Sequence, residues 1–277
     1  MSGRAAHRPV KVDAWRHGTM SPARRNLPEE TPVAIVYDGA TYAVMMATPC
    51  DLADFALGFS LTEGVVADTS EILDLEIAEH EFGMQVRLWL AEGRAEALQG
   101  RSRRLAGPVG CGLCGIESLA EASRAVRRVA LDPRLNAGGL MAGMAALAPN
   151  QPANIATRAT HAAGFWHPRE GLVAVREDVG RHNALDKLVG ALATRPPAAR
   201  DGAVLLTSRV SVEMVQKTAA AGIPVIVAVS APTTLAVRTA EAAGITLVAV
   251  ARADGFEVFA HAGRIVGDDL RRLRAGS

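Results

Sequence analysis

Apolar runs and helical patterns alternate along the C-terminal half of the chain, and this alternation constrains the fold more than any other feature. The apolar runs are 172–175, 204–206, 224–229 and 245–250, and the helical patterns between them are 184–192, 211–221 and 235–243. Continuous apolar strands separated by helices are typical of a parallel sheet that is covered on both faces. The sequence therefore predicts an α/β fold whose C-terminal half holds a largely parallel sheet.

Polar side chains collect where these strands end. They are Arg176, Glu177, Asp178, Ser208, Arg209, Ser230, Thr233 and Arg252. In open α/β sheets, ligands bind beyond the carboxyl ends of the strands, and the helix N-termini that lie there favour phosphate groups. We therefore expect a nucleotide-bearing ligand in this crevice.

A structural alternative stays open for each of these side chains. Serine and threonine at such positions are ordinary helix caps. His182 and Asp186 are four residues apart and could pair on a helix surface, while Arg181 and Lys187 could be solvated. His161 fits a structural role as well as a catalytic one.

The first third of the chain predicts a small α+β unit. The expected elements are strands at 33–37, 42–46, 72–79 and 84–90, a helix at 52–61 and, beyond this unit, helices at 116–130 and 137–147. Asp38-Gly39 supplies the turn of the first hairpin, and Asp51 is placed to cap the helix at 52–61.

Residues 1–27 are predicted to form a flexible tail. The first twenty residues are polar and arginine-bearing, without the apolar run of a signal peptide. No apolar run reaches the ~18–20 residues that a membrane-spanning helix needs, and a formal net charge of +1 does not indicate nucleic-acid binding. We therefore expect a cytoplasmic protein that binds neither membranes nor nucleic acid.

Two of the three cysteines, Cys111 and Cys114, lie in the segment Gly-Cys-Gly-Leu-Cys-Gly at 110–115. Because so few cysteines cannot form a disulfide framework, a Cys-x-x-Cys pair indicates metal binding or thiol chemistry. The glycines allow a mobile, approachable loop. The helix start expected after it favours thiolate, as do the upstream Arg101, Arg103 and Arg104. The sequence therefore predicts a nucleophilic sulfur.

Metal binding is the main alternative for this pair. A zinc site needs four ligands, and His161 and His167 are the residues that could complete one, although they lie far along the chain. A thioredoxin-like site is disfavoured because the pair comes late and between glycines. A zinc deaminase site lacks its His-x-Glu and its proline, and Cys50 is expected to be a small buried apolar group. No metal site is predicted.

Further motifs accompany the cysteine loop. They are Thr-His-Ala-Ala at 160–163, Arg-Glu-Asp-Val-Gly-Arg-His-Asn-Ala-Leu-Asp-Lys at 176–187, Ser208-Arg209 with Glu-Met-Val-Gln-Lys at 213–217, and Val-Ser-Ala-Pro-Thr-Thr-Leu-Ala at 229–236. Together they resemble the FdhD family of formate dehydrogenase accessory sulfurtransferases, over about residues 28–261. The resemblance implies a homodimer whose C-terminal domain has the cytidine-deaminase fold without the zinc.

The resemblance also implies a role in molybdenum-cofactor maturation. A cysteine desulfurase would hand sulfur to Cys111 as a persulfide, with Cys114 as its partner. The sulfur would then pass to molybdenum bis(molybdopterin guanine dinucleotide) before this cofactor enters apo formate dehydrogenase. The family's cofactor-binding segment corresponds to Val250, Ala251, Arg252, Ala253, Asp254 and Gly255. The chain departs from the family pattern at Ala253–Phe256, where a glycine and an arginine are expected.

Residues from the crevice complete the expected binding site. Arg181, His182 and Arg209 are expected to help hold the cofactor, and GDP or another guanine nucleotide is expected in the same site. The predicted division of the chain is 1–27 tail, 28–100 small α+β domain, 101–115 cysteine loop and 116–277 α/β domain. Two other functions stay open: a cofactor-binding chaperone that moves no sulfur, and a scaffold that holds zinc.

Overall fold

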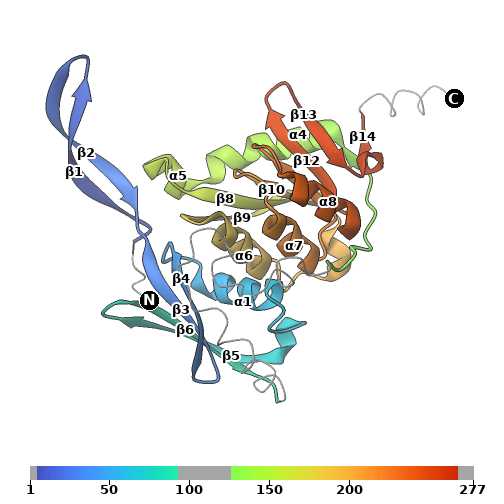
Figure 1. Cartoon of the computed structure of the whole chain (residues 1–277), viewed down its shortest axis with the longest axis horizontal. Coiled ribbons are helices and arrows are strands. Elements are labelled where there is room, and N and C mark those ends of the chain that lie inside the picture. Colours follow the sequence, from blue (N-terminus) through green and yellow to red (C-terminus); the bar gives the residue numbers. More distant parts are fainter. Residues whose placement is uncertain (1–4, 93–125, 268–277) are drawn as a thin grey trace.

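The computed structural model describes residues 5–92 and 126–267 (Figure 1). Its strands are β1 (His7–Arg16), β2 (Thr19–Pro28), β3 (Thr31–Tyr37), β4 (Ala40–Ala47), β5 (Ile72–His80), β6 (Gly83–Leu90), β7 (Leu135–Asn136), β8 (His161–His167), β9 (Gly171–Asp178), β10 (Ala203–Leu206), β11 (Val225–Ala228), β12 (Thr246–Arg252), β13 (Gly255–Ala260) and β14 (Ile265–Val266). Its α-helices are α1 (Leu52–Thr62), α4 (Ala137–Leu147), α5 (Pro152–Thr157), α6 (Arg181–Ala191), α7 (Val212–Ala220) and α8 (Thr234–Ala243). Short 3₁₀ helices lie at Thr69–Glu71, Ala148–Asn150, Pro197–Arg200 and Ala262–Arg264.

The central sheet has six strands in the order β13-β12-β11-β10-β8-β9. The pairings β10–β11 and β11–β12 are parallel. The pairings β10–β8, β8–β9 and β12–β13 are antiparallel. The prediction of a largely parallel sheet was therefore wrong, although the α/β class holds. The reason is that β8–β9 and β12–β13 are hairpins, and strands joined by a short turn must be antiparallel.

Helices cover both faces of this sheet, as the continuous apolar strands predicted (Figure 1). On one face α6, α7 and α8 bury residues such as Leu185, Met214 and Ala240 against β10, β11 and β12. On the other face α4 buries Leu140 and Leu147. Every residue of β10 and β11 is buried, which explains why these strands show no polar alternation.

A second, four-stranded sheet has the order β4-β3-β6-β5 and packs on α1. Both hairpins and the helix predicted for this part of the chain are confirmed. The cap assigned to Asp51 is wrong: its backbone is left-handed, with φ 53°, and its side chain makes no capping hydrogen bond. Asp51 instead faces Arg176, with 3.8 Å between the Oδ1 and Nε atoms.

Two glycines let α1 and α6 approach closely, which joins the two halves of the molecule. A Cβ atom at Gly58 would lie 1.7 Å from the Asp186 carbonyl oxygen, and one at Gly190 would lie 1.8 Å from that of Asp54. Any side chain at either position would collide with backbone, so the contact requires glycine on both helices. The small sheet is thereby fixed against the helical layer of the large one.

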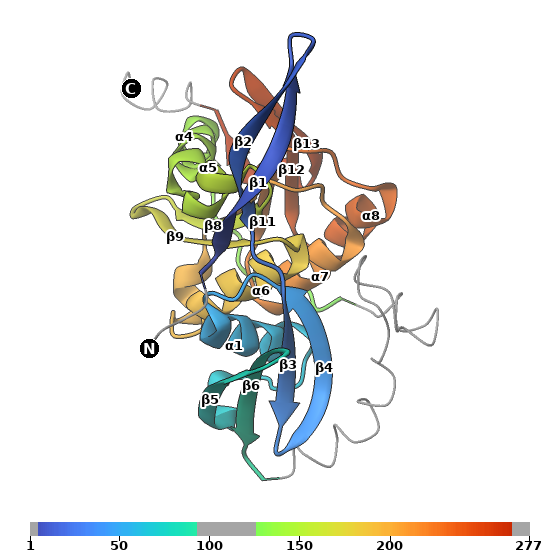
Figure 2. The same cartoon turned by 90° about the vertical axis from the view of Figure 1, so that its left-hand side faces the viewer.

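The N-terminal residues form an ordered ribbon in place of the expected flexible tail. β1 and β2 pair antiparallel over ten residue pairs, from His7–Pro28 to Arg16–Thr19. The ribbon projects away from the body of the molecule (Figures 1 and 2). The sequence did not predict these strands because charged and small residues occupy both faces of the ribbon, so apolar and polar residues do not alternate clearly along it.

Two further helices were predicted from the sequence, at 116–130 and 137–147. The helix at 137–147 is confirmed as α4. The helix expected at 116–130 falls largely outside the described residues, and 126–134 carry neither helix nor strand. Among the described helices, none is long and apolar enough to cross a bilayer.

Candidate functional site

Three helices begin at the carboxyl edge of the parallel strands. α6 follows β9, α7 follows β10 and α8 follows β11, with N-caps at Gly180, Ser211 and Thr233. The loops after β10 and β11 are joined, since the Thr233 amide donates to the Val210 carbonyl at 3.0 Å. Aligned helix starts concentrate free amides and partial positive charge at one edge. This edge of the sheet is therefore suited to an anionic ligand.

Cationic side chains gather at the same edge. His161 begins β8, while Arg181 and His182 form the first turn of α6. Burial lowers the pKa of His161, and the neighbouring Arg181 lowers it further against the opposing effect of Asp178. His161 is therefore largely neutral at pH 7, and Arg181 is near enough to act on it. Arg209, in the loop after β10, is exposed.

Four buried polar atoms at this edge have no hydrogen-bond partner. They are Arg181 Nε, His182 Nε2, Ser211 Oγ and Glu213 Oε2. His182 Nε2 lies 3.9 Å from Glu213 Oε2, which is too long for a hydrogen bond. Most buried polar groups in proteins are satisfied. A cluster of unsatisfied groups at a sheet's carboxyl edge therefore indicates a place where polar ligand atoms or water complete the structure.

Glu213 is a residue of this edge that the sequence analysis named only as part of a motif. Burial alone would raise the pKa of its carboxyl group, but His182, Ser211 and its own backbone amide outweigh burial and lower the pKa to about 2. The carboxylate is therefore ionised at neutral pH beside the His182 imidazole. A carboxylate in the first turn of a helix that starts at the carboxyl edge was the signal in the sequence.

The predicted segment 250–255 closes the other side of this edge. Val250 has φ 53° at a bulge between β12 and β13, an outlier for a β-branched residue. The Arg252 guanidinium donates to the Val229 carbonyl, so β12 is tied to the loop after β11. Ala253 and Asp254 are exposed in the turn, whereas Ala251 is buried in the core under α4. Strained backbone that the surroundings hold in place is common at binding sites.

Most of the 176–187 motif forms a buried joint between α6 and the end of β4, and does not contribute to the carboxyl edge of the sheet. Lys187 is fully buried and its ammonium lies 2.7 Å from Asp178 Oδ2, while it donates to the Thr48 carbonyl at 2.9 Å. The Thr48 amide in turn donates to Asp178 at 2.9 Å, and Asn183 donates to both Asp178 and Met46. The alternative of a solvated Lys187 is therefore wrong. The joint ties the end of β4 to α6.

A second buried network involves Asp186, the residue next to Lys187 on α6. Lys217 of α7 donates to both carboxylate oxygens of Asp186, at 2.9 and 3.0 Å, and to Glu63 at 2.7 Å. Burial alone would lower the pKa of Lys217, but Asp186 and Glu63 outweigh it and raise the pKa above its usual value. The surface pair of His182 with Asp186 is thus wrong, because Asp186 is buried against Lys217.

The predicted sulfur site, Cys111 and Cys114, lies outside the described residues. Cys50 is the one cysteine in the part of the chain that the structure describes, and it is partly buried. Burial raises the pKa of the Cys50 thiol, although Lys187 opposes the shift. A thiol with a raised pKa is a weak nucleophile at neutral pH, so Cys50 is unsuited to sulfur transfer.

The zinc alternative gains no support from the histidines named for it. His161 and His167 stand at opposite ends of β8, about 20 Å apart at ~3.3 Å per residue. Buried His167 lies instead 3.0 Å from Asp201 and 2.9 Å from Glu170. Within the described ranges, no three His, Cys, Asp or Glu side chains are grouped to hold a metal ion.

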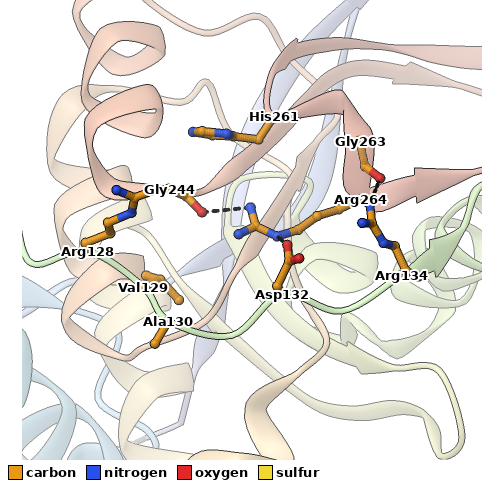
Figure 3. A pocket seen from close by; sticks show the side chains of 9 residues that line it. All are labelled: Arg128, Val129, Ala130, Asp132, Arg134, Gly244, His261, Gly263 and Arg264. Atoms are coloured by element: carbon orange, nitrogen blue, oxygen red, sulfur yellow. Dashed lines mark hydrogen bonds and ion pairs between the residues drawn. The ribbon is translucent and has the colours of Figure 1, made fainter.

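A separate hollow lies at the opposite edge of the sheet, where β12 begins (Figure 3). It has a volume of about 550 Å³ and is lined by Arg128, Val129, Ala130, Asp132, Arg134, Gly244, His261, Gly263 and Arg264. Arg264 donates to Asp132 and to the Gly244 carbonyl, both at 2.7 Å. Its guanidinium therefore fastens the segment 126–134 to the C-terminus of α8 and is not free for a ligand.

Comparison with known proteins identifies the family. Residues 28–266 match the model described as the FdhD/NarQ family. The chain belongs to the FdhD/NarQ family. It is 52% identical to the sulfur carrier protein FdhD of Agrobacterium fabrum, over 96% of this chain and 98% of that protein. It is 49% identical to the sulfur carrier protein FdhD of Cupriavidus necator, over 94% of this chain and 90% of that protein.

A solved structure has a similar fold. A candidate formate dehydrogenase accessory protein from Desulfotalea psychrophila superimposes with a TM-score of 0.75 and 25% identity. The match covers 95% of this chain and the whole of that one. The overall fold of this chain therefore resembles that of a crystal structure.

Proposed function

We propose that this protein is a sulfur carrier that supports the maturation of formate dehydrogenase. The observation that carries the proposal is its identity of 52% and 49% to proteins named as sulfur carriers, with nearly complete coverage of both chains. The Cys-x-x-Cys pair in a glycine-rich segment supplies the chemistry that such a carrier needs.

Cys111 is the sulfur-bearing residue in this proposal. Its thiolate attacks the outer sulfur of a cysteine desulfurase persulfide, so that a new S–S bond forms on Cys111 as the donor's S–S bond breaks. The donor cysteine leaves as a thiolate, and the exchange needs neither oxidant nor reductant. Cys50 is excluded from this role because burial raises the pKa of its thiol.

The cargo that receives the sulfur is molybdenum bis(molybdopterin guanine dinucleotide), which we place at the carboxyl edge of the central sheet. Three helix starts, the side chains of Arg181, His182 and Arg209, and the unsatisfied polar atoms beside them fit its phosphates and guanine groups. Arg252 supplies the remaining cation, and the exposed turn at 253–254 takes the place of the family's glycine and arginine. GDP is expected to occupy the same edge.

The finer description of the protein follows from the same proposal. The large sheet with its two helical layers is a cytidine-deaminase-like domain without zinc, and the protein acts in the cytoplasm as a homodimer. Its partners are a cysteine desulfurase and apo formate dehydrogenase.

Complementation in cells tests the sulfur-carrier role. A strain that lacks its own carrier should regain formate dehydrogenase activity with the wild-type chain and with Cys50→Ala, but not with Cys111→Ala at equal protein level. Full activity with Cys111→Ala would contradict sulfur transfer and favour a chaperone that only binds the cofactor.

A further inference from the structure

The ribbon β1–β2, residues His7–Pro28, is an arm that packs little on the rest of the described chain. It extends for about 34 Å, at ~3.4 Å per residue, and among the described elements its main contacts are with α5. An isolated two-stranded ribbon is marginally stable in water. The arm therefore fits a role in which a second surface covers it.

One face of the arm is both cationic and apolar. Lys11 lies directly opposite Arg24, and Trp15 lies directly opposite Met20 four pairs further on, so both pairs project from the same face. Like charges placed opposite each other destabilise a strand pair, and Trp15 and Met20 are 69% and 59% exposed. The whole arm contains five arginines and lysines but one aspartate. Contact with an acidic and partly apolar surface would offset the repulsion between like charges and would bury the exposed apolar side chains.

The same chain carries such a surface on β5 and the turn that follows it. Residues 66–86 contain six carboxylates: Asp68, Glu71, Asp74, Glu76, Glu79 and Glu81. The cation that faces them from β6 is Arg87, which pairs with Glu76 at 3.2 Å. Leu73 and Phe82 in this acidic hairpin are 68% and 81% exposed. Among the described strands, β5 also lies at the edge of its sheet, with β6 as its neighbour.

The arm and the acidic hairpin lie at opposite ends of the molecule, as both views show (Figures 1 and 2). One chain cannot bring them together. Two chains related by a two-fold axis can, because each arm then reaches the acidic hairpin of the other chain and both contacts close at once. The pairing leaves the carboxyl edge of the central sheet to its own ligand.

We infer that the arm of one chain binds the acidic hairpin of a second copy, and that this reciprocal contact forms the dimer. Charge complementarity sets the partner, and the exposed apolar residues at both surfaces supply the buried area. The inference rests on the two surfaces alone and is independent of the sulfur chemistry proposed above.

Charge reversal tests this inference on the full-length protein. Lys11→Glu with Arg24→Glu makes the arm acidic, and Asp74→Lys with Glu81→Lys makes the hairpin basic. Each double variant should weaken the dimer roughly tenfold or more in sedimentation equilibrium, because both contacts become repulsive. An equal mixture of the two variants should recover it, since each arm then meets a hairpin of opposite charge.

A matched control reverses two exposed arginines elsewhere, Arg169→Glu with Arg238→Glu, and should leave the dissociation constant within about twofold. Circular dichroism should show that every variant is folded. A wild-type chain that stays monomeric would overturn the inference. So would a dimer that neither reversal weakens, or one that the mixture fails to restore.

Discussion

Polar and charged groups on α6 lie in two different environments, and the contrast separates the part of the helix that holds the molecule together from the part that we propose to bind a ligand. Lys187 and Asp186 lie on the inner turns, where every charge is buried and paired. Arg181 and His182 lie in the first turn, where buried polar atoms are left without partners. A paired buried charge indicates a structural role, whereas an unsatisfied one at a sheet edge indicates a ligand.

Replacing Lys187 by methionine gives the largest expected effect. Asp178 would be left buried without its counter-charge, which costs about 3–5 kcal/mol of unfolding free energy. Urea unfolding followed by circular dichroism measures the loss. Arg238→Met, a change to an exposed cation on α8, is the control and should stay within about 0.5 kcal/mol. Equal effects at the two positions would show that the joint is not structural.

Gly190→Ala tests the close contact of α1 with α6. The new Cβ atom would lie 1.8 Å from the Asp54 carbonyl oxygen, so the helices must separate. Overpacking of this kind costs about 1–3 kcal/mol, to be read from thermal and urea unfolding. Gly267→Ala, where no atom lies within 4 Å of the added group, should be nearly neutral. A neutral Gly190→Ala would mean that the two helices are not held at this spacing.

Arg209→Ala and Arg252→Ala test the proposed ligand site at the carboxyl edge of the central sheet. Each should lower the affinity for GDP by about tenfold, the order expected for a lost hydrogen bond to a charged group. The unfolding free energy should change little for exposed Arg209, and by about 1 kcal/mol for Arg252, which loses its bond to the Val229 carbonyl. Titration calorimetry with GDP gives the affinities. Arg238→Ala, on exposed α8, should bind as the wild type does. Unchanged GDP affinity in both edge variants would place the nucleotide elsewhere.

The pH dependence of Glu213→Gln gives the smallest expected effect. Because the folded pKa of Glu213 is about 2, below its ordinary value of 4.5, the ionised carboxylate stabilises the fold at and above pH 4.5. This contribution is lost as the pH falls from 4.5 towards 2. The wild type should therefore be more stable than Glu213→Gln at pH 7, with a difference that shrinks in this window. A difference that is constant with pH would rule out the ionised form.

The sequence predicted the regular elements better than the way they are joined. β10, α7, β11 and α8 were expected within a few residues, because their apolar patterns reflect burial on both faces. β8 was missed, although it lies inside the sheet between β10 and β9, because its short run His161–His167 begins and ends with histidine. The sense of each strand pairing depends on connections that local patterns do not record.

The candidate site shows the same limit. Arg181, His182, Arg209 and Arg252 were named because cations at strand ends indicate phosphate binding, and the structure brings them to one edge of the sheet. The buried pairing of Lys187 with Asp178 was not predicted, because a motif does not reveal which of its charges meets a partner from another part of the chain. Tertiary packing decides that, through Thr48 and the close contact of α1 with α6.

Intact-mass spectrometry after incubation with a cysteine desulfurase and cysteine tests the central claim most directly. The account predicts a sulfur-sized mass gain that reductant removes, present in the wild type and in Cys50→Ala and absent in Cys111→Ala. Cys114→Ala shows whether the second cysteine of the pair is needed for loading. A gain that persists in Cys111→Ala, or no gain in any chain with an active donor present, would contradict the assignment of Cys111 as the sulfur carrier.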